Sequence, residues 1–145
     1  MHEGERGADI ELEIELESVA AFRTQLRRFL RRTDVVTSQA GLTTQRYDLL
    51  LMLKSADREG RGVRLTDLCE LLQLQQTAVT ELVKRSEQAG LIDRRPSAED
   101  GRSTLLRLTA EGERRLRQVV EVLREERQTL GAAFKDLDEL FQATT

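Results

Sequence analysis

Residues 89–112 read AGLIDRRPSAEDGRSTLLRLTAEG, and this stretch decides the fold. Two strand-like segments, residues 91–95 and 103–108, flank a polar tip. Asp100 followed by Gly101 is a strong indication of a turn within that tip. The stretch therefore predicts a β-hairpin that is basic on both arms.

Two short helices are expected immediately before this hairpin. Thr66 is the expected N-cap of the first, Gly90 ends the second, and the turn around Gln73 contains no glycine. The apolar positions expected to face inward are Leu68, Cys69, Leu71, Leu72, Ala78, Val79, Leu82 and Val83. Two short helices joined by a tight turn are a helix-turn-helix candidate, and a hairpin directly after them makes a winged helix.

The N-terminal region is ambiguous over residues 10–17, where strict alternation is typical of a strand. The longer pattern favours one helix over residues 10–36, because its apolar residues recur at spacings of three, four and seven. These apolar residues are Leu12, Leu16, Val19, Leu26, Phe29 and Leu30, with Phe22 beside them. Glu and Leu are also good helix formers.

Further elements complete the expected fold, which is mainly α with a small β-hairpin wing. Thr43 is expected to cap a helix that ends near Gly60, and residues 63–65 are expected to hold a short strand. Thr109 is expected to cap a last helical region, with a kink or break at Gly131.

Charge is distributed unevenly along the 145 residues, whose net charge is −3. Residues 1–20 carry −6, residues 21–60 carry +4, residues 61–109 carry +1 and residues 110–145 carry −2. The acidic start is expected to be a solvated face or frayed tail; the alternative is that it competes with an anionic ligand. A total of −3 therefore does not exclude a positioned DNA-binding face.

The residue counts and the apolar pattern argue against several classes of protein. Cys69 is the one cysteine and His2 the one histidine, which is too few for a disulfide, a His/Cys metal site or a histidine-based triad. No apolar run approaches a membrane span, and the start is acidic where a signal peptide is basic. We expect a soluble, cytoplasmic protein that binds no cofactor and is not an enzyme.

Five segments in order resemble the multiple antibiotic resistance regulator (MarR) family of bacterial transcription factors over residues 10–145. These segments are LTDL (65–68), TAVT (77–80), AGLIDR (89–94), DGR (100–102) and LTAEG (108–112). The resemblance implies an obligate homodimer in which the first helix and the last two intertwine. Both ends of the chain do carry long apolar stripes; the alternative is that these stripes pack together within one monomer.

The division into domains follows from the resemblance. Residues 1–9 are expected to be an acidic N-terminal tail, and residues 41–109 the winged helix-turn-helix DNA-binding domain. Residues 10–40 and 110–145 are expected to form the helical dimerisation region.

The resemblance also assigns site residues for double-stranded DNA. The expected DNA-binding residues are Thr66, Gln75, Gln76, Thr77, Thr80, Lys84, Arg85, Arg95, Asp100, Arg102 and Ser103. Arg102 is expected to enter the minor groove, and Asp100 either holds it or stiffens the wing through an ion pair. Polar residues near the start of the second short helix meet bases and phosphates, and Gln can pair with adenine. Lys84 and Arg85 contact phosphate or brace the wing, and Arg95 contacts phosphate.

Two positions depart from the family pattern. Glu81 stands where many relatives carry a basic residue, so its carboxylate either accepts a hydrogen bond from a cytosine amine or repels the backbone. Ser86 stands where relatives usually place an apolar core residue.

The expected function is that of a ligand-responsive repressor that binds a pseudo-palindromic operator as a homodimer. An aromatic or anionic effector would bind beside Arg46, Tyr47 and the arginines at positions 27, 28, 31 and 32, which alternatively form a solvated or interfacial basic face. Two other functions stay open: a winged-helix interaction module without DNA binding, and a redox-sensing regulator based on Cys69, a residue that fits a buried core position.

Overall fold

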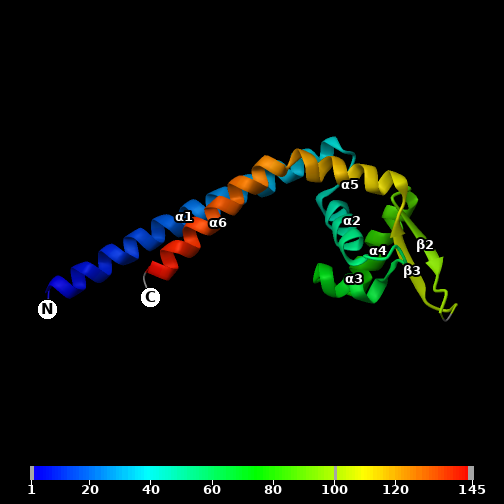
Figure 1. The fold of residues 1–145 in the computed structure, drawn as a ribbon, viewed down its shortest axis with the longest axis horizontal. Coiled ribbons are helices and arrows are strands. Elements are labelled where there is room, and N and C mark those ends of the chain that lie inside the picture. The colour runs from blue at the N-terminus through cyan, green and yellow to red at the C-terminus, as the bar shows by residue number, and fades with distance from the viewer. Residues whose placement is uncertain (1, 100, 144–145) are drawn as a thin grey trace. The chain divides into compact units, whose positions relative to one another are not determined.

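Helices dominate the part of the chain that the computed structural model describes, residues 2–99 and 101–143 (Figure 1). The chain forms two units: a helical unit, Met1–Thr33 with Val122–Thr145, and a winged-helix unit, Asp34–Glu121. Helix α1 (His2–Gln39) supplies residues to both units. Within the described ranges, no helix is long and apolar enough to cross a membrane.

The helical unit pairs α1 with α6 (Arg124–Ala143) in antiparallel orientation (Figure 1). The rings of Phe22 and Phe134 pack edge to face with centroids 4.6 Å apart. Nearer the other end of the pair, Arg32 Nε donates to Glu126 Oε1 over 3.0 Å. The two helices therefore contact each other along much of the length of α6.

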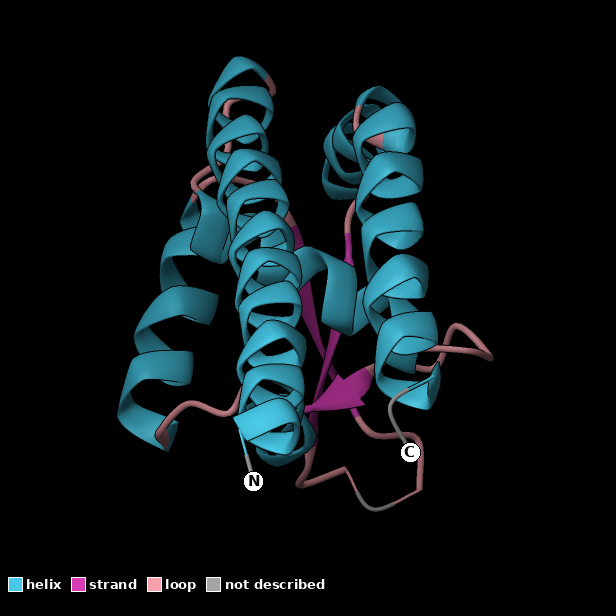
Figure 2. Ribbon diagram, turned by 90° about the vertical axis from the view of Figure 1, so that its left-hand side faces the viewer, coloured by secondary structure: helices cyan, strands magenta, loops and turns pink. Residues whose placement is uncertain are grey.

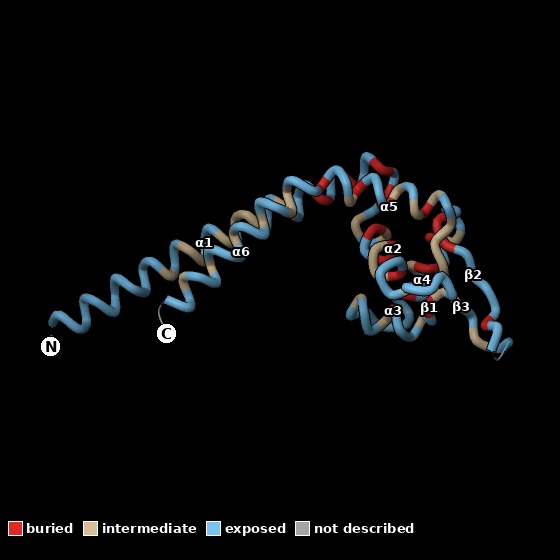
Figure 3. The backbone as a smooth tube through the Cα atoms, viewed as in Figure 1, coloured by how far each residue is buried: buried red, intermediate tan, exposed pale blue. Residues whose placement is uncertain are grey.

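Helix α1 is longer than expected at both ends. It begins at His2 instead of residue 10, so the described part of the expected acidic tail is helical. Glu3 and Glu5 lie in its first turn, where negative charge complements the helix dipole. Most of the first half of α1 is exposed, as the pale blue tube in Figure 3 shows.

The winged-helix unit contains the remaining elements. These are α2 (Thr44–Ala56), β1 (Val63–Arg64), α3 (Leu65–Leu72), α4 (Gln76–Gln88), β2 (Ile92–Pro96), β3 (Thr104–Leu108) and α5 (Ala110–Val122). The strands form an antiparallel sheet in the order β1-β3-β2 (Figure 2, magenta). The expected hairpin of β2 and β3 is confirmed, and β1 extends it to a third strand.

One apolar core holds this unit together (Figure 3, red). Its most deeply buried large side chains come from α2, α3, α4, the turn before β2, the sheet and α5, and include Leu49, Leu50, Leu53, Leu68, Val79, Val83, Leu91, Leu106 and Val119. Two of the residues expected to face inward are exposed instead, Leu71 at 43% and Ala78. Cys69, Leu72 and Leu82 are half-buried.

Two of the three predicted N-caps are confirmed. Thr43 accepts a hydrogen bond from the backbone N–H of Arg46 over 3.1 Å, and Thr109 accepts one from Gly112 over 3.0 Å. Thr66 is not a cap, because the sheet holds Arg64 in extended backbone and α3 begins two residues earlier than expected.

The other helix ends also differ from expectation. Helix α2 ends at Ala56, and Gly60 adopts its left-handed φ of +72° in the following loop. Gly131 lies inside α6, and the break falls at Leu123, between α5 and α6. A single glycine costs a helix only about 1 kcal/mol, so it does not by itself end one.

Candidate nucleic-acid interface

Helix α4 presents a polar row opposite its buried row. Val79, Val83 and Ser86 face the core. The polar side chains that the sequence singled out are all exposed: Gln76, Thr77, Thr80, Glu81, Lys84 and Arg85, with Gln75 at the N-cap. The structure thus brings these predicted residues together on one face of one helix.

The turn before α4 forms without glycine. Gln73 adopts left-handed backbone, with φ 55° and ψ 41°, and ends α3. The backbone N–H of Leu74 then donates to the carbonyl oxygen of Cys69 over 3.2 Å. A polar side chain tolerates this conformation at some cost, and it supplies the sharp turn that a helix-turn-helix needs.

The two departures from the family pattern have local partners. Glu81 Oε1 accepts from Arg85 Nε over 3.1 Å, so each offsets the other's charge on the exposed face. Ser86 is fully buried, and its hydroxyl donates to the carbonyl oxygen of Leu82 over 2.8 Å. The buried hydroxyl is therefore satisfied within its own helix.

An ion pair that the sequence analysis missed connects the wing to α4. Arg94 in β2 donates through Nε to Glu87 in α4. Lys84 and Arg85 were candidates for such a brace, but Arg85 pairs with Glu81. Arg94 and Arg95 are consecutive in β2, so their side chains point to opposite faces of the sheet. This alternation was the sequence signal that could have indicated a partner for Arg94 on the other face.

The wing tip is organised by Ser97, which is 8% exposed. Its N–H donates to the carbonyl oxygen of Ser103 over 2.7 Å, and its carbonyl oxygen accepts from Gly101 over 2.9 Å. Gly101 has a φ of +63°. Arg102 follows directly and is exposed, while Asp100 lies outside the described residues.

Arginines also gather on the outer face of the sheet. Arg64, Leu105 and Arg95 are in register across β1, β3 and β2, so they share one face, and Arg107 follows two residues after Leu105. Arg61, Arg64, Arg95 and Arg107 line a groove of about 640 Å³ there, together with Glu99. Only Arg95 was expected from the sequence, since strand register decides which side chains share a face.

The remaining predicted site residues lie elsewhere in the winged-helix unit. Thr66 is exposed on α3. Tyr47, proposed for the effector, is a core residue of α2 at 8% exposure, and Arg46 beside it is half-buried.

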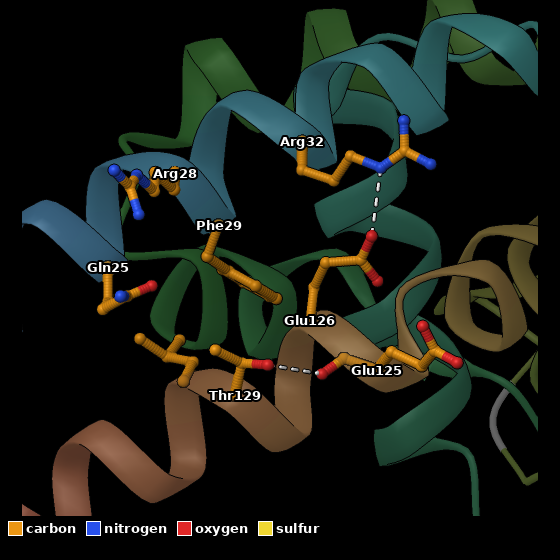
Figure 4. Close-up of a pocket in the computed structure, with 8 residues that line it drawn as sticks. Gln25, Arg28, Phe29, Arg32, Glu125, Glu126 and Thr129 are labelled. Atoms are coloured by element: carbon orange, nitrogen blue, oxygen red, sulfur yellow. Dashed lines mark hydrogen bonds and ion pairs between the residues drawn. The ribbon is translucent and has the colours of Figure 1, made fainter.

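A pocket of about 360 Å³ lies between α1 and α6 in the helical unit (Figure 4). Arg28, Phe29 and Arg32 line it from α1, and Glu125, Glu126 and Thr129 from α6. A backbone hydrogen bond and the Arg32 side chain lower the pKa of Glu126. Two of the four first-helix arginines predicted for an anion therefore line this pocket.

Comparisons with known proteins agree with this geometry. Residues 40–103 match the model of the MarR family. YdgJ of Bacillus subtilis (strain 168), an uncharacterized HTH-type transcriptional regulator, is 36% identical over 76 residues, 52% of this chain and 44% of that protein. The match thus spans less than half the length of that relative.

Solved structures share the fold. An S. aureus MepR mutant bound to an oligodeoxyribonucleotide has a TM-score of 0.70 at 20% identity, covering 88% of this chain and 97% of that chain. An E. coli MarR mutant complexed with operator DNA has a TM-score of 0.64 at 18% identity, covering 86% and 91%. The predicted winged-helix fold is confirmed.

Proposed function

We propose that this chain, whose residues 40–103 match the model of the MarR family, is a DNA-binding transcriptional regulator of that family. One observation carries the proposal. The polar row of α4 is exposed opposite the core, and the Arg94–Glu87 ion pair ties the arginine-bearing wing to that same helix. A helix of this kind fits the major groove, and a hairpin with a cation at its tip reaches the minor groove.

The proposed contacts divide by type. Gln76, Thr77 and Thr80 reach base edges, because they lie in the first turns of α4. Gln75, at the N-cap, and the exposed Thr66 and Lys84 contact phosphates. Arg85 is held by Glu81 and contributes less than its charge suggests.

The wing supplies a second set of contacts. Arg102 enters the minor groove, with Asp100 as its proposed partner, and the Ser103 carbonyl shapes the tip. Arg95 contacts phosphate together with Arg64 and Arg107, which share its face of the sheet.

We further propose that the protein acts as a homodimer on a pseudo-palindromic operator. Exposed apolar side chains on α1 support this assembly, since Ile10, Leu12 and Leu16 are all more than half exposed. Two copies of α4 would then read half-sites about one helical turn apart. Repression follows where the operator overlaps a promoter.

An aromatic or anionic effector is proposed for the pocket between α1 and α6. Phe29 offers a ring face, and Arg28 and Arg32 offer positive charge. Arg32 already pairs with Glu126, so a carboxylate ligand would compete with that ion pair.

The test starts from a random pool of DNA duplexes, from which the protein selects its site. The dissociation constants of the selected duplex are then measured for wild type, Arg102→Ala and the control Arg124→Ala, an exposed arginine on α6. Arg102→Ala should weaken binding by about 1–3 kcal/mol and the control by much less. If the binding free energy of Arg102→Ala stays within about 0.5 kcal/mol of wild type, Arg102 does not contact the DNA. Failure to enrich any duplex would overturn the proposal.

A further inference from the structure

Arg115 belongs to a cluster of charged side chains in the first turns of α5. Its side chain is 26% exposed, whereas that of the neighbouring Arg114 is 63% exposed. Both arginines donate to the carboxylate of Glu111. Arg115 also donates through Nη1 to the carbonyl oxygen of Gly41 over 3.1 Å. It thereby joins two segments that lie 74 residues apart in the sequence.

Gly41 lies at the corner between α1 and α2, which hydrogen bonds close. Gly41 has a φ of +73°, and the N–H of Leu42 donates to the carbonyl oxygen of Thr37 over 2.9 Å, which caps the end of α1. Thr44, the first residue of α2, donates to Asp34 Oδ1 over 2.5 Å. The corner and these turns of α5 both lie within the winged-helix unit. A hydrogen bond to the Gly41 carbonyl oxygen therefore holds the start of α2.

Helix α5 also holds the other end of α2. Lys54, in the last turn of α2, donates to Glu113 of α5. Helix α2 has 13 residues and is therefore about 20 Å long. Attachments at both ends fix the direction of a helix, whereas a single attachment lets it pivot. Arg115 supplies one of these two attachments.

The end of α4 is joined to the start of α5. The hydroxyl of Thr109 donates to the carbonyl oxygen of Gly90 over 2.6 Å, and its N–H donates to that of Leu91 over 3.0 Å. Arg115 follows Thr109 at a distance of about 9 Å along the helix. Helix α4 also packs against α2 within the unit. Arg115 therefore connects the two elements, α2 and α5, that support α4.

We infer that Arg115 is a positioning residue for α4, the helix proposed to read DNA. It acts by holding α2 and α5 at a fixed angle, and it does not contact DNA itself. The inference rests on the proposed function and adds a residue that lies outside the proposed interface. Base contacts need side chains placed within about 0.5 Å, whereas phosphate contacts carry no sequence information. Loss of Arg115 should therefore lower sequence preference more than general affinity for DNA.

The variant Arg115→Ala should remain folded. Glu111 keeps its hydrogen bonds from Arg114, and Gly41 is exposed, so water can replace the guanidinium at its carbonyl oxygen. Arg114→Ala is the matched control. It removes the same charge and a partner of the same carboxylate, but it leaves the contact with Gly41 in place.

DNA binding tests the positioning role. Dissociation constants for the selected duplex and for a scrambled duplex are measured with wild type, Arg115→Ala and Arg114→Ala. Arg115→Ala should lower the preference for the selected duplex about fivefold, which corresponds to one hydrogen bond, with an unchanged dependence on salt. Arg114→Ala should match wild type. An unchanged preference in Arg115→Ala would overturn the inference, and so would a salt slope reduced by about 1, which marks a direct phosphate contact.

Hydrogen exchange without DNA tests the attachment itself. The backbone N–H groups of residues 41–47 and 89–91 should exchange faster in Arg115→Ala than in wild type or Arg114→Ala, because α2 and α4 then lose a shared support. Unchanged exchange in either segment would overturn the positioning role, even where DNA binding falls.

The wild-type protein separates this inference from the proposed function. If wild type enriches no duplex, the proposed function and the inference fail together. If wild type and Arg115→Ala prefer the selected duplex equally, the regulator stands and only the role of Arg115 fails.

Discussion

Gly112 marks the point where the first turn of α5 meets the backbone at Leu91. A Cβ atom at Gly112 would lie 2.2 Å from the Leu91 carbonyl oxygen. Thr109 closes the same junction, since its N–H donates to Leu91 over 3.0 Å and its hydroxyl to the carbonyl oxygen of Gly90 over 2.6 Å. The segment LTAEG therefore has a physical reason for both its threonine and its glycine.

Replacing this glycine should destabilise the protein. Gly112→Ala forces the helix and the wing apart, at a cost of about 1–3 kcal/mol in the free energy of unfolding. Gly131→Ala is the matched control, because nothing lies within 4 Å of its added Cβ. That control should be stabilised by about 0.5–1 kcal/mol. Urea unfolding measures both, and equal effects would refute the close approach at Gly112.

Glu111 makes the stability of the protein depend on pH in the acid range. Hydrogen bonds from Arg114 and Arg115 lower its pKa from 4.5 to about 2. A lowered pKa stabilises the fold above pH 4.5, and that contribution is lost as the pH falls through about 2. Glu111→Gln should therefore show a smaller drop in Tm between pH 5 and pH 2 than wild type. An identical drop in both proteins would count against this ion-pair network.

The capping residues show how far local sequence reaches. Thr43 and Thr109 were predicted correctly, because each cap depends only on the three residues that follow. Thr66 was wrong because β1 pairs with β3, some forty residues away, and that pairing sets the start of α3. Leu71 fits the apolar pattern of a helix, but it is exposed because no other element of its unit covers it.

At the scale of elements, the sequence predicted the hairpin but not the basic groove on the outer face of its sheet. Alternation and the Asp-Gly turn predicted β2 and β3. The basic groove arises only when β1 joins them, because the register then aligns Arg64 with Arg95. No local sequence pattern predicts which short strand completes a sheet.

This arginine groove should contribute affinity without sequence preference. Replacing Arg64 and Arg107 together by alanine removes two proposed phosphate contacts, which should reduce the slope of log K against log salt by about 2. The preference for the selected duplex over a scrambled one should stay the same. Arg124→Ala serves again as the control, and a changed preference would mean that the groove reads bases.

At the scale of the whole molecule, net charge conceals the proposed DNA-binding region. The −6 of residues 1–20 lies on α1, outside the winged-helix unit. The rest of the chain is positive by 3. Composition alone could not separate the two, because it does not record which residues share a folding unit.

Stoichiometry follows from the proposed homodimer. Two chains should bind one duplex that holds two half-sites, and a duplex with a single half-site should bind much more weakly because one α4 then lacks its target. Analytical ultracentrifugation of the complex measures the ratio. One chain per full site would contradict the dimeric arrangement.

Fluorescence anisotropy of the native protein on its selected duplex, set against a scrambled duplex of equal length at 50 and 200 mM salt, decides whether this winged helix reads DNA. Phosphate contacts combined with base contacts predict at least about a tenfold preference for the selected duplex, and affinity that falls steeply as salt rises. Equal binding to both duplexes, or affinity indifferent to salt, would contradict the proposed regulator.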